Sequence, residues 1–297
     1  MKQFTILTVF LSLFLLMACH DKREQEKIVT VTIEPQRFFA EKIAGDHFKV
    51  YSVVPAGQSP ETYDPTPRQM VQVGESAAYL QIGNLGFEQV WMQKIRENNP
   101  SLKIFDMSKG MKLLTEPEEG HHPEEEGEEH HHHAGGVDPH IWSSVTGAKV
   151  IARNTLDAFI AIDPDHADEY RKNYESLLAE IDHTEKVITR LLDPLIYRTF
   201  IIYHPALTYF AREFHLTQLC IEMDGKEPSP SQLKALVETA RANQTKVVFI
   251  QEEFDKKNAE LIAKETGCRL VTINPLAYHW NREMIYIAKA LDDGQTD

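Results

Sequence analysis

The chain has 297 residues, of which 31 are Lys or Arg and 45 are Asp or Glu, so its formal net charge is −14. A nucleic-acid-binding protein needs a basic face to neutralise phosphates, and this acidic composition excludes that class. With 42% hydrophobic and 26% charged residues, the chain is a globular protein of one large or two ordinary domains and not a polytopic membrane protein.

The first residues have the pattern of a lipoprotein signal. A short basic start is followed by the apolar run Thr5–Ala18 and then by Cys19. The run is too short to cross a bilayer, which takes roughly 20 helical residues. We therefore expect residues 1–18 to be a removed signal peptide, Cys19 to be lipidated and residues 19–27 to be a polar tether. The mature protein would then be held in the periplasm or on the outer face of the cytoplasmic membrane.

Two stretches of the chain alternate strands with helices, which is typical of parallel α/β structure. We expect an N-terminal lobe over residues 28–143 and a C-terminal lobe over residues 196–297, each with a four-stranded sheet. The predicted strands are Ile28–Ile33, Phe48–Val54, Ala77–Ile82 and Leu102–Asp106 in the first lobe, and Thr199–Tyr203, Thr217–Met223, Lys246–Ile250 and Arg269–Ile273 in the second.

Residues 144–195 between the lobes carry apolar residues at helical spacing, interrupted at Asp163-Pro164. The second part, Pro164–Leu192, would extend about 40 Å at 1.5 Å per residue. That length suits a stiff helix joining two lobes. The alternative is two ordinary helices packed on one domain.

Two cysteines remain after Cys19, namely Cys220 and Cys268. In an oxidising compartment they could form a disulfide. Both lie in or next to strand-like runs, so buried thiols are an equal alternative.

Polar residues that follow the predicted strands are candidates for chemistry, because ligands of parallel α/β sheets gather beyond the carboxyl ends of the strands. Glu61 lies in a loop stiffened by prolines, His140 follows the acidic segment, His204 follows a strand, and His279 lies soon after another. Imidazoles and a carboxylate from separate strand ends can bind a divalent metal such as Zn²⁺. A lone His at a strand end is more often structural, so each residue alone is weak support.

The motifs around these residues resemble the zinc/manganese solute-binding proteins of ABC transporters, and the likeness covers nearly all of the mature chain. The family implies two α/β lobes joined by a rigid helix, with the metal between the lobes and one ligand from each of four strand-end loops. The motifs are Gly57–Tyr63, Asp138–Trp142, His204–Ala211 and Ile273–Leu276, in that order.

By this resemblance, His140 and His204 fall on two family ligands, and Glu61 falls where the family usually has His. Asn274 occupies the position where manganese-binding members have Asp. An amide is a poor zinc ligand, so we expect His279 to be the fourth ligand, with Asn274 or water as alternatives.

The acids and histidines near other strand ends receive no role. Gln251 stands where many family members have Glu. The neighbouring Glu252 and Glu253 would point to opposite faces of an extended segment, which makes a poor acid/base pair. The remaining histidines receive no role, because His20 lies in the tether, His166 and His183 lie on polar helix faces, and His47 and His215 precede strands.

The negative charge is concentrated between Glu116 and Glu129, which includes eight Glu and no Lys or Arg. Removing these eight charges from −14 leaves −6. We expect residues 116–134 to be a disordered loop, because such a polar segment cannot bury a core. Zinc-binding family members often carry a loop of this kind, and it would collect metal near the cleft. The alternative is a solvated insert that binds metal incidentally. Its histidines are His121, His122, His130, His131, His132 and His133.

We expect Zn²⁺ in preference to Mn²⁺, because Mn²⁺ favours oxygen-rich sites of higher coordination number. The predicted function is therefore a lipid-anchored, monomeric receptor that delivers Zn²⁺ to an ABC permease and is not an enzyme. A bound ion would close the cleft by bringing ligands of the two lobes together. The alternatives are an extracytoplasmic zinc hydrolase, for which the chain lacks an H-E-x-x-H motif, and a zinc-binding adhesin or storage lipoprotein.

Overall fold

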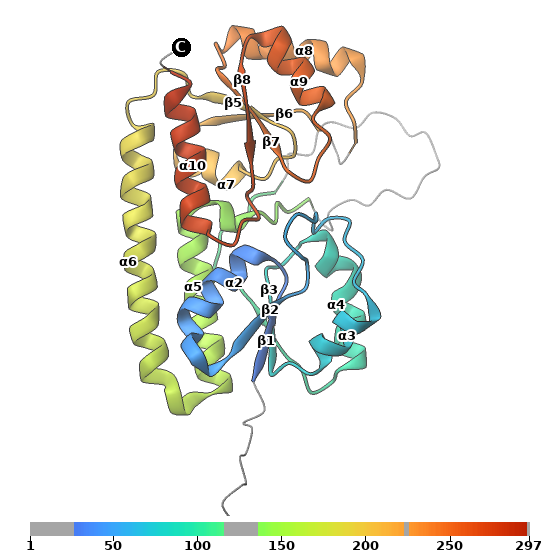
Figure 1. Cartoon of the computed structure of the whole chain (residues 1–297), viewed down its shortest axis with the longest axis vertical. Helices are drawn as coiled ribbons and strands as arrows, with labels where there is room; N and C mark the ends of the chain where they lie inside the picture. The colour runs from blue at the N-terminus through green and yellow to red at the C-terminus, as the bar shows by residue number, and fades with distance from the viewer. Residues whose placement is uncertain (1–26, 116–135, 223–225, 296–297) are drawn as a thin grey trace, which may run out of the picture.

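The computed structural model describes residues 27–115, 136–222 and 226–295, which form two four-stranded parallel sheets flanked by helices (Figure 1). The predicted signal peptide, Cys19 and the His- and Glu-rich segment lie outside these residues. Within the described ranges, no helix is both long enough and apolar enough to cross a membrane. The predicted α/β fold with two sheets is confirmed, whereas the lobe boundaries at 28–143 and 196–297 stay predictions.

The N-terminal sheet has the strand order β2-β1-β3-β4, and every pair is parallel. Its carboxyl edge therefore gathers the loops that follow all four strands. The strands are β1 (Ile28–Val31), β2 (Lys49–Ser52), β3 (Ala78–Gln81) and β4 (Lys103–Asp106), and the helices are α2 (Glu34–Ala44), α3 (Pro67–Gly74) and α4 (Gly86–Asn98), with a 3₁₀ turn, η1, at Gly45–His47.

The C-terminal sheet repeats this order as β6-β5-β7-β8, again with parallel pairs throughout. Its strands are β5 (Thr199–Ile202), β6 (Thr217–Cys220), β7 (Val247–Gln251) and β8 (Arg269–Ile273), and its helices are α7 (Thr208–Glu213), α8 (Pro230–Ala242), α9 (Lys257–Thr266) and α10 (Trp280–Asp293). Cys220 and Cys268 are not joined by a disulfide, and the Cys268 thiol donates to the Thr245 carbonyl.

The same local signal starts one helix in each lobe. Thr66 precedes α3 and Ser229 precedes α8, and each is followed by Pro and then, three positions on, by Gln. The hydroxyl accepts from the Gln backbone N–H, while the Gln side chain accepts from the backbone N–H of the capping residue. This reciprocal pairing satisfies donors that a helix start leaves open, and Pro at the first position fits the helical φ.

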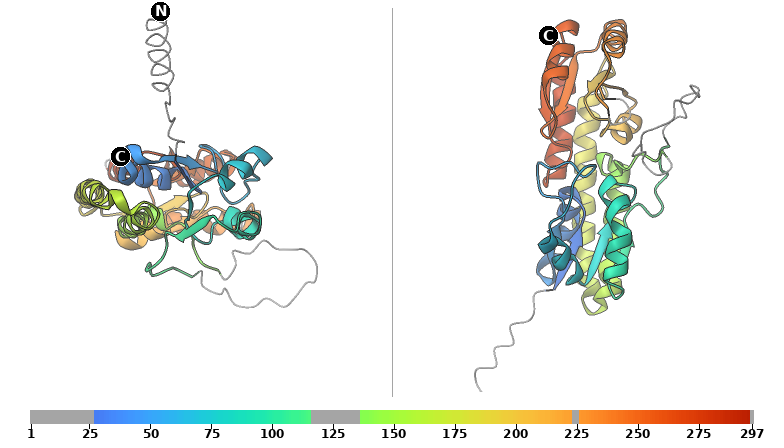
Figure 2. Two further views of the ribbon diagram at one scale, coloured as in Figure 1. Left: turned by 90° about the horizontal axis from the view of Figure 1, so that it is seen from below. Right: turned by 90° about the vertical axis from the view of Figure 1, so that its right-hand side faces the viewer.

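Helices α5 (Val145–Ile162) and α6 (Ala167–Leu192) connect the lobes and form one flank of the molecule (Figure 2). The 26 residues of α6 correspond to about 39 Å. This helix packs on α2 at one end and on α10 at the other, and Figure 1 shows it running beside both sheets. Its buried side includes Leu177, Ile181 and Ile188. The prediction of a long helix joining the two lobes is therefore confirmed, and the alternative of two helices packed on one domain is not.

Side chains also join the lobes directly. The ring of Phe39 on α2 packs on Trp280 at the start of α10, with ring centroids 5.4 Å apart. The Glu213 carboxylate at the end of α7 accepts hydrogen bonds from the backbone N–H groups of Val145 and Thr146, at 2.7 and 3.0 Å. It also accepts from the Thr146 hydroxyl. A carboxylate at this position satisfies open N–H donors and complements the positive end of α5.

Replacing Glu213 with Ala should lower the free energy of unfolding by about 1–2 kcal/mol, because it removes charge-assisted hydrogen bonds at the start of α5. Urea denaturation followed by circular dichroism measures this change. Glu175→Ala, at an exposed position on α6, is the matched control and should change stability by less than about 0.5 kcal/mol. Equal losses in both variants would contradict this role of Glu213.

Candidate metal site

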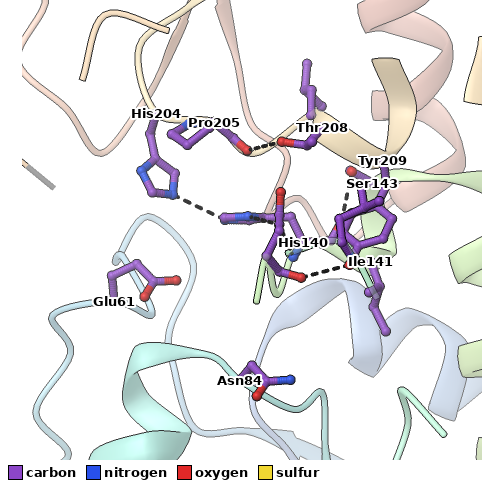
Figure 3. A network of polar contacts seen from close by, with 12 residues as sticks. Glu61, Asn84, His140, Ile141, Ser143, His204, Pro205, Thr208 and Tyr209 are labelled. Carbon is purple, nitrogen blue, oxygen red and sulfur yellow. Dashed lines mark hydrogen bonds and ion pairs between the residues drawn. The ribbon is translucent and has the colours of Figure 1, made fainter. Parts of the chain in front are cut away.

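Three of the four expected ligands meet at the junction of the lobes. Each of Glu61, His140 and His204 offers one ligand atom, and these atoms lie within 4.8 Å of one another. Glu61 belongs to the loop after β2, His140 lies before the turn η2 (Ile141–Ser143), and His204 follows β5. Figure 3 shows the three side chains facing a common point.

The Glu61 carboxylate is held by the first turn of α4. Its Oε2 accepts from the Gly86 N–H at 3.1 Å, and the Phe87 N–H donates to the Pro60 carbonyl at 2.8 Å. A Cβ atom on Gly86 would lie only 2.6 Å from Glu61 Oε2 and 2.8 Å from the Glu61 carbonyl oxygen. Glycine at position 86 therefore permits the close approach that positions Glu61.

His140 is buried, with 5% of its surface exposed, and Asp138 sets its orientation. Asp138 Oδ1 lies 2.8 Å from both the backbone nitrogen and Nδ1 of His140. Burial works against ionisation of both groups, but their mutual attraction and hydrogen bonds prevail, lowering the pKa of Asp138 and raising the pKa of His140. Because an ionised carboxylate only accepts, Nδ1–H donates and Nε2 is left as the metal-binding atom.

His204 is oriented in the same way from the other lobe. Its Nδ1 lies 3.0 Å from Glu222 Oε2, and its ring stacks on Phe254 with centroids 5.4 Å apart. The Gln251 amide both accepts from the His204 N–H and donates to the His204 carbonyl. An ionised glutamate at 251 could not donate that second bond, so the amide suits this backbone contact.

The two histidines face each other through the ring nitrogens that do not contact Asp138 or Glu222. His140 Nε2 lies 3.2 Å from His204 Nε2. Two ligands of a tetrahedral zinc ion with bonds of 2.0–2.1 Å are about 3.4 Å apart. The pair is thus already spaced as zinc ligands would be.

Glu253 is the residue that the sequence reasoning set aside. It lines the same cavity, two residues after the end of β7. Burial and the neighbouring Glu252 raise its pKa, while His204 and His140 oppose that rise. The signal that could have identified Glu253 is its place directly after β7, because ligands gather beyond the carboxyl ends of parallel strands. The segment after Gln251 is a turn and not an extended strand.

The cavity has a volume of about 10 Å³, close to the space that one water molecule needs. Trp142 forms part of its wall and donates from Nε1 to the Pro275 carbonyl at 3.0 Å, while Trp280 donates to the Trp142 carbonyl at 2.6 Å. These hydrogen bonds therefore join the two lobes next to the site. The lining residues are Ser59, Pro60, Glu61, His140, Trp142, His204, Ala206, Glu253, Phe254, Pro275 and Leu276.

The structure does not bring His279 or Asn274 to this cavity, in contrast to the sequence expectation. After β8 the chain turns so that Pro275 and Leu276, instead of Asn274, form the wall. The Asn274 side chain is engaged with the Leu276 N–H and the Glu252 carboxylate. His279 is exposed at the start of α10. The fourth strand-end group at the cavity is therefore Glu253.

Comparisons with known proteins agree with this architecture. The family described as "Zinc-uptake complex component A periplasmic" (ZnuA) matches residues 29–290. The high-affinity zinc uptake system protein ZnuA of Bacillus subtilis strain 168 is 29% identical, covering 93% of this chain and 89% of its own length. The crystal structure of a zinc-bound ZnuA deletion mutant is 35% identical, with a TM-score of 0.82, covering 91% of this chain and 98% of that one.

A further relative carries another metal in its name. The iron ABC transporter substrate-binding lipoprotein MtsA of Streptococcus pyogenes serotype M6 is 26% identical, covering 90% of this chain and 86% of its own length. Metal binding is thus common to these relatives, whereas the metal differs between their names.

Replacing Gly86 with Ala should weaken Zn²⁺ binding about 10- to 100-fold, the usual effect of disturbing a group that positions a metal ligand. The added methyl group would displace Glu61. Isothermal titration calorimetry measures the change. Gly74→Ala is the matched control, because its methyl group would meet only the flexible Asn99 side chain, and it should bind as the unmodified protein does. An unchanged affinity in Gly86→Ala would contradict a ligand role for Glu61.

Proposed function

Because the chain belongs to the ZnuA family of periplasmic zinc-uptake components, we propose that it captures Zn²⁺ outside the cytoplasm and delivers it to the permease of an ABC transporter. The observation that carries this proposal is the 3.2 Å approach of His140 Nε2 and His204 Nε2 from opposite lobes. Two carboxylates, Glu61 and Glu253, line the same small cavity. The four groups together supply the four ligands of a closed zinc site.

We propose Zn²⁺ as the preferred metal over Mn²⁺ and iron. Two imidazole nitrogens suit zinc, but two carboxylates would also suit manganese, so donor type alone decides little. Coordination number favours zinc. Zinc is satisfied by four ligands, whereas oxygen-rich Mn²⁺ sites are octahedral, and a cavity of about 10 Å³ has little room for additional waters.

The location follows from the proposed lipid anchor at Cys19. Relatives such as MtsA are named as lipoproteins, which supports extension of the lipoprotein interpretation to this chain. Lipidation would keep the receptor, as a monomer, at the outer face of the membrane that contains the permease. Diffusion of the loaded protein would then be confined to the membrane surface.

A hydrolase is less compatible with the cavity. A zinc hydrolase keeps an open coordination position beside a substrate cleft. Here Glu253 lines the cavity beside the three clustered groups, and the cavity volume of about 10 Å³ is small. We therefore propose that metal binding is the whole activity and that the protein is not an enzyme.

The His- and Glu-rich segment is proposed to collect metal for the cleft. Its base is adjacent to the site, since Thr115 and Val137 form an antiparallel bridge and the Asp138 N–H donates to the Leu114 carbonyl at 2.9 Å. Asp138 in turn holds His140. A metal ion bound weakly by this segment would thus be kept close to the tight site.

His140→Ala and His204→Ala should each weaken Zn²⁺ binding by more than about 100-fold, because even outer partners of metal ligands contribute 10- to 100-fold. Glu253→Gln should also weaken it. Titration calorimetry of metal-stripped protein with Zn²⁺, repeated with Mn²⁺, measures these affinities and the preference. His279→Ala is the matched control and should leave the tight site unchanged.

Three results would each overturn one part of this assignment: the place of the site, its fourth ligand or its metal. Tight Zn²⁺ binding that survives removal of both His140 and His204 would exclude the cleft as the zinc site. A loss in His279→Ala with no loss in Glu253→Gln would return His279 to the ligand set in place of Glu253. Tighter binding of Mn²⁺ than of Zn²⁺ would reject the proposed metal while leaving the site in place.

Deletion of residues 116–133 should remove weak Zn²⁺ equivalents and leave one tight site. The paired backbone at Thr115 and Val137 gives the shortened chain a ready turn, so the fold should persist. Equilibrium dialysis with metal analysis counts the bound ions, and circular dichroism monitors the fold. Loss of the tight site together with the segment would show that the segment supplies a ligand to the cleft.

A further inference from the structure

A second cluster of metal-binding side chains lies at the far end of the N-terminal lobe. His47, Asp163 and His166 each offer one ligand atom, and these atoms lie within 4.8 Å of one another. His47 ends the turn η1, just before β2 begins, whereas Asp163 and His166 belong to the turn between α5 and α6. The cleft lies beyond the opposite, carboxyl end of β2, so the full length of the sheet separates the two places (Figure 1).

The two imidazole rings lie side by side and are tilted relative to each other. The His47 and His166 ring centroids are 3.9 Å apart, with an interplanar angle of 31°. The two residues are far apart in sequence, so the packing of η1 against the α5–α6 turn creates the pair. Imidazole nitrogens are good ligands for zinc, and the packing brings one ligand atom of each ring within 4.8 Å of the other and of the Asp163 carboxylate.

A buried carboxylate, that of Asp163, contacts one of the two rings. Asp163 is 7% exposed, and its Oδ2 lies 2.8 Å from His166 Nδ1 and accepts from the Tyr170 hydroxyl at 2.6 Å. The Lys27 ammonium lies 3.4 Å from the other oxygen, Oδ1. Burial opposes ionisation, but these partners lower the pKa of Asp163. The carboxylate is therefore fixed in place and negatively charged.

A second carboxylate stands on the solvent side. Glu169 Oε2 lies 2.9 Å from His47 Nε2, and about half of the Glu169 side chain is exposed. The hydrogen bond from His47 lowers the pKa of Glu169. Ion entry and a small rearrangement are feasible because His47 and His166 are also partly exposed. Ligand atoms must close from 4.8 Å to about 3.4 Å around a tetrahedral zinc ion.

We propose that His47, Asp163 and His166 form a second Zn²⁺ site, remote from the cleft, with Glu169 as the fourth ligand. The donor set of two nitrogens and two carboxylate oxygens is one that zinc accepts. Binding must displace the Lys27 ammonium and the hydrogen bonds that now join His47 to Glu169 and His166 to Asp163, so the site is weaker than the cleft and fills after it. Its occupation would fasten the start of β2 to the α5–α6 turn.

The proposal does not depend on the transport function, and its test uses the full chain. Crystals equilibrated with excess Zn²⁺ should show an anomalous peak at the zinc absorption edge next to the ring nitrogens of His47 and His166 and the Asp163 carboxylate. In solution, the double variant His47→Gln/His166→Gln should bind one Zn²⁺ equivalent fewer than the unmodified protein in equilibrium dialysis. The matched control is His183→Gln/His215→Gln, at two exposed histidines elsewhere, which should keep that equivalent.

The outcomes separate this site from the cleft. The cleft variant His140→Ala/His204→Ala should keep the anomalous peak next to His47, His166 and Asp163. The double variant His47→Gln/His166→Gln should keep tight binding in the cleft, and its melting temperature without metal serves as the test of folding. Absence of the anomalous peak in the unmodified protein, together with an unchanged number of bound ions in the double variant, would overturn the proposal.

Discussion

The whole site depends on two imidazole nitrogens being held 3.2 Å apart across the junction of the lobes. Asp138 and Glu222 each bind the Nδ1 of one ring, so both Nε2 atoms point at the same place. Two nitrogen lone pairs at this distance repel each other unless a proton or a cation lies between them. Nearby carboxylates raise the pKa of His140 in spite of its burial. The electrostatic potential at this place is therefore negative and favours a positive charge. A divalent ion meets that demand better than a proton, because it binds both nitrogens at once.

The scaffold supplies this geometry by repeating one simple device. Each sheet is fully parallel and has the same strand order, so each gathers its strand-end loops at one edge, and the two edges face each other. Helix α6 packs on elements of both lobes, while Trp142 and Trp280 add hydrogen bonds next to the cavity. Ligands on stiff loops, supported by such a frame, lose little conformational freedom when the ion binds. The frame thus accounts for pre-organisation, and the side chains supply the nitrogen and carboxylate groups that can bind a metal.

Much of this was predictable from sequence because the signals were local. Strand and helix positions followed from hydrophobic periodicity, and Glu61 and His204 lie in loops that follow parallel strands, β2 and β5. His140 was predicted from its Asp138–Trp142 motif instead. Glu253 was missed because adjacent residues were assumed to alternate faces, whereas β7 has already ended at Gln251. His279 was favoured for its chemistry, but the turn after β8 places Pro275 and Leu276 at the cavity. The His47–His166 pair depends on packing between distant segments, which periodicity and spacing do not encode.

The charge around the cleft explains why an acidic protein suits this ion. Glu61 and Glu253 line the cavity, and Asp138 and Glu222 stand behind the imidazoles. Without an ion these groups repel one another in a partly dehydrated space, and burial raises the pKa of Glu253. A bound divalent cation would remove much of that repulsion and so would stabilise the arrangement in which these groups lie together. Because His140 and His204 come from opposite lobes, a contact that separated the lobes would also separate these two nitrogens, and a bound ion would lose nitrogen ligands.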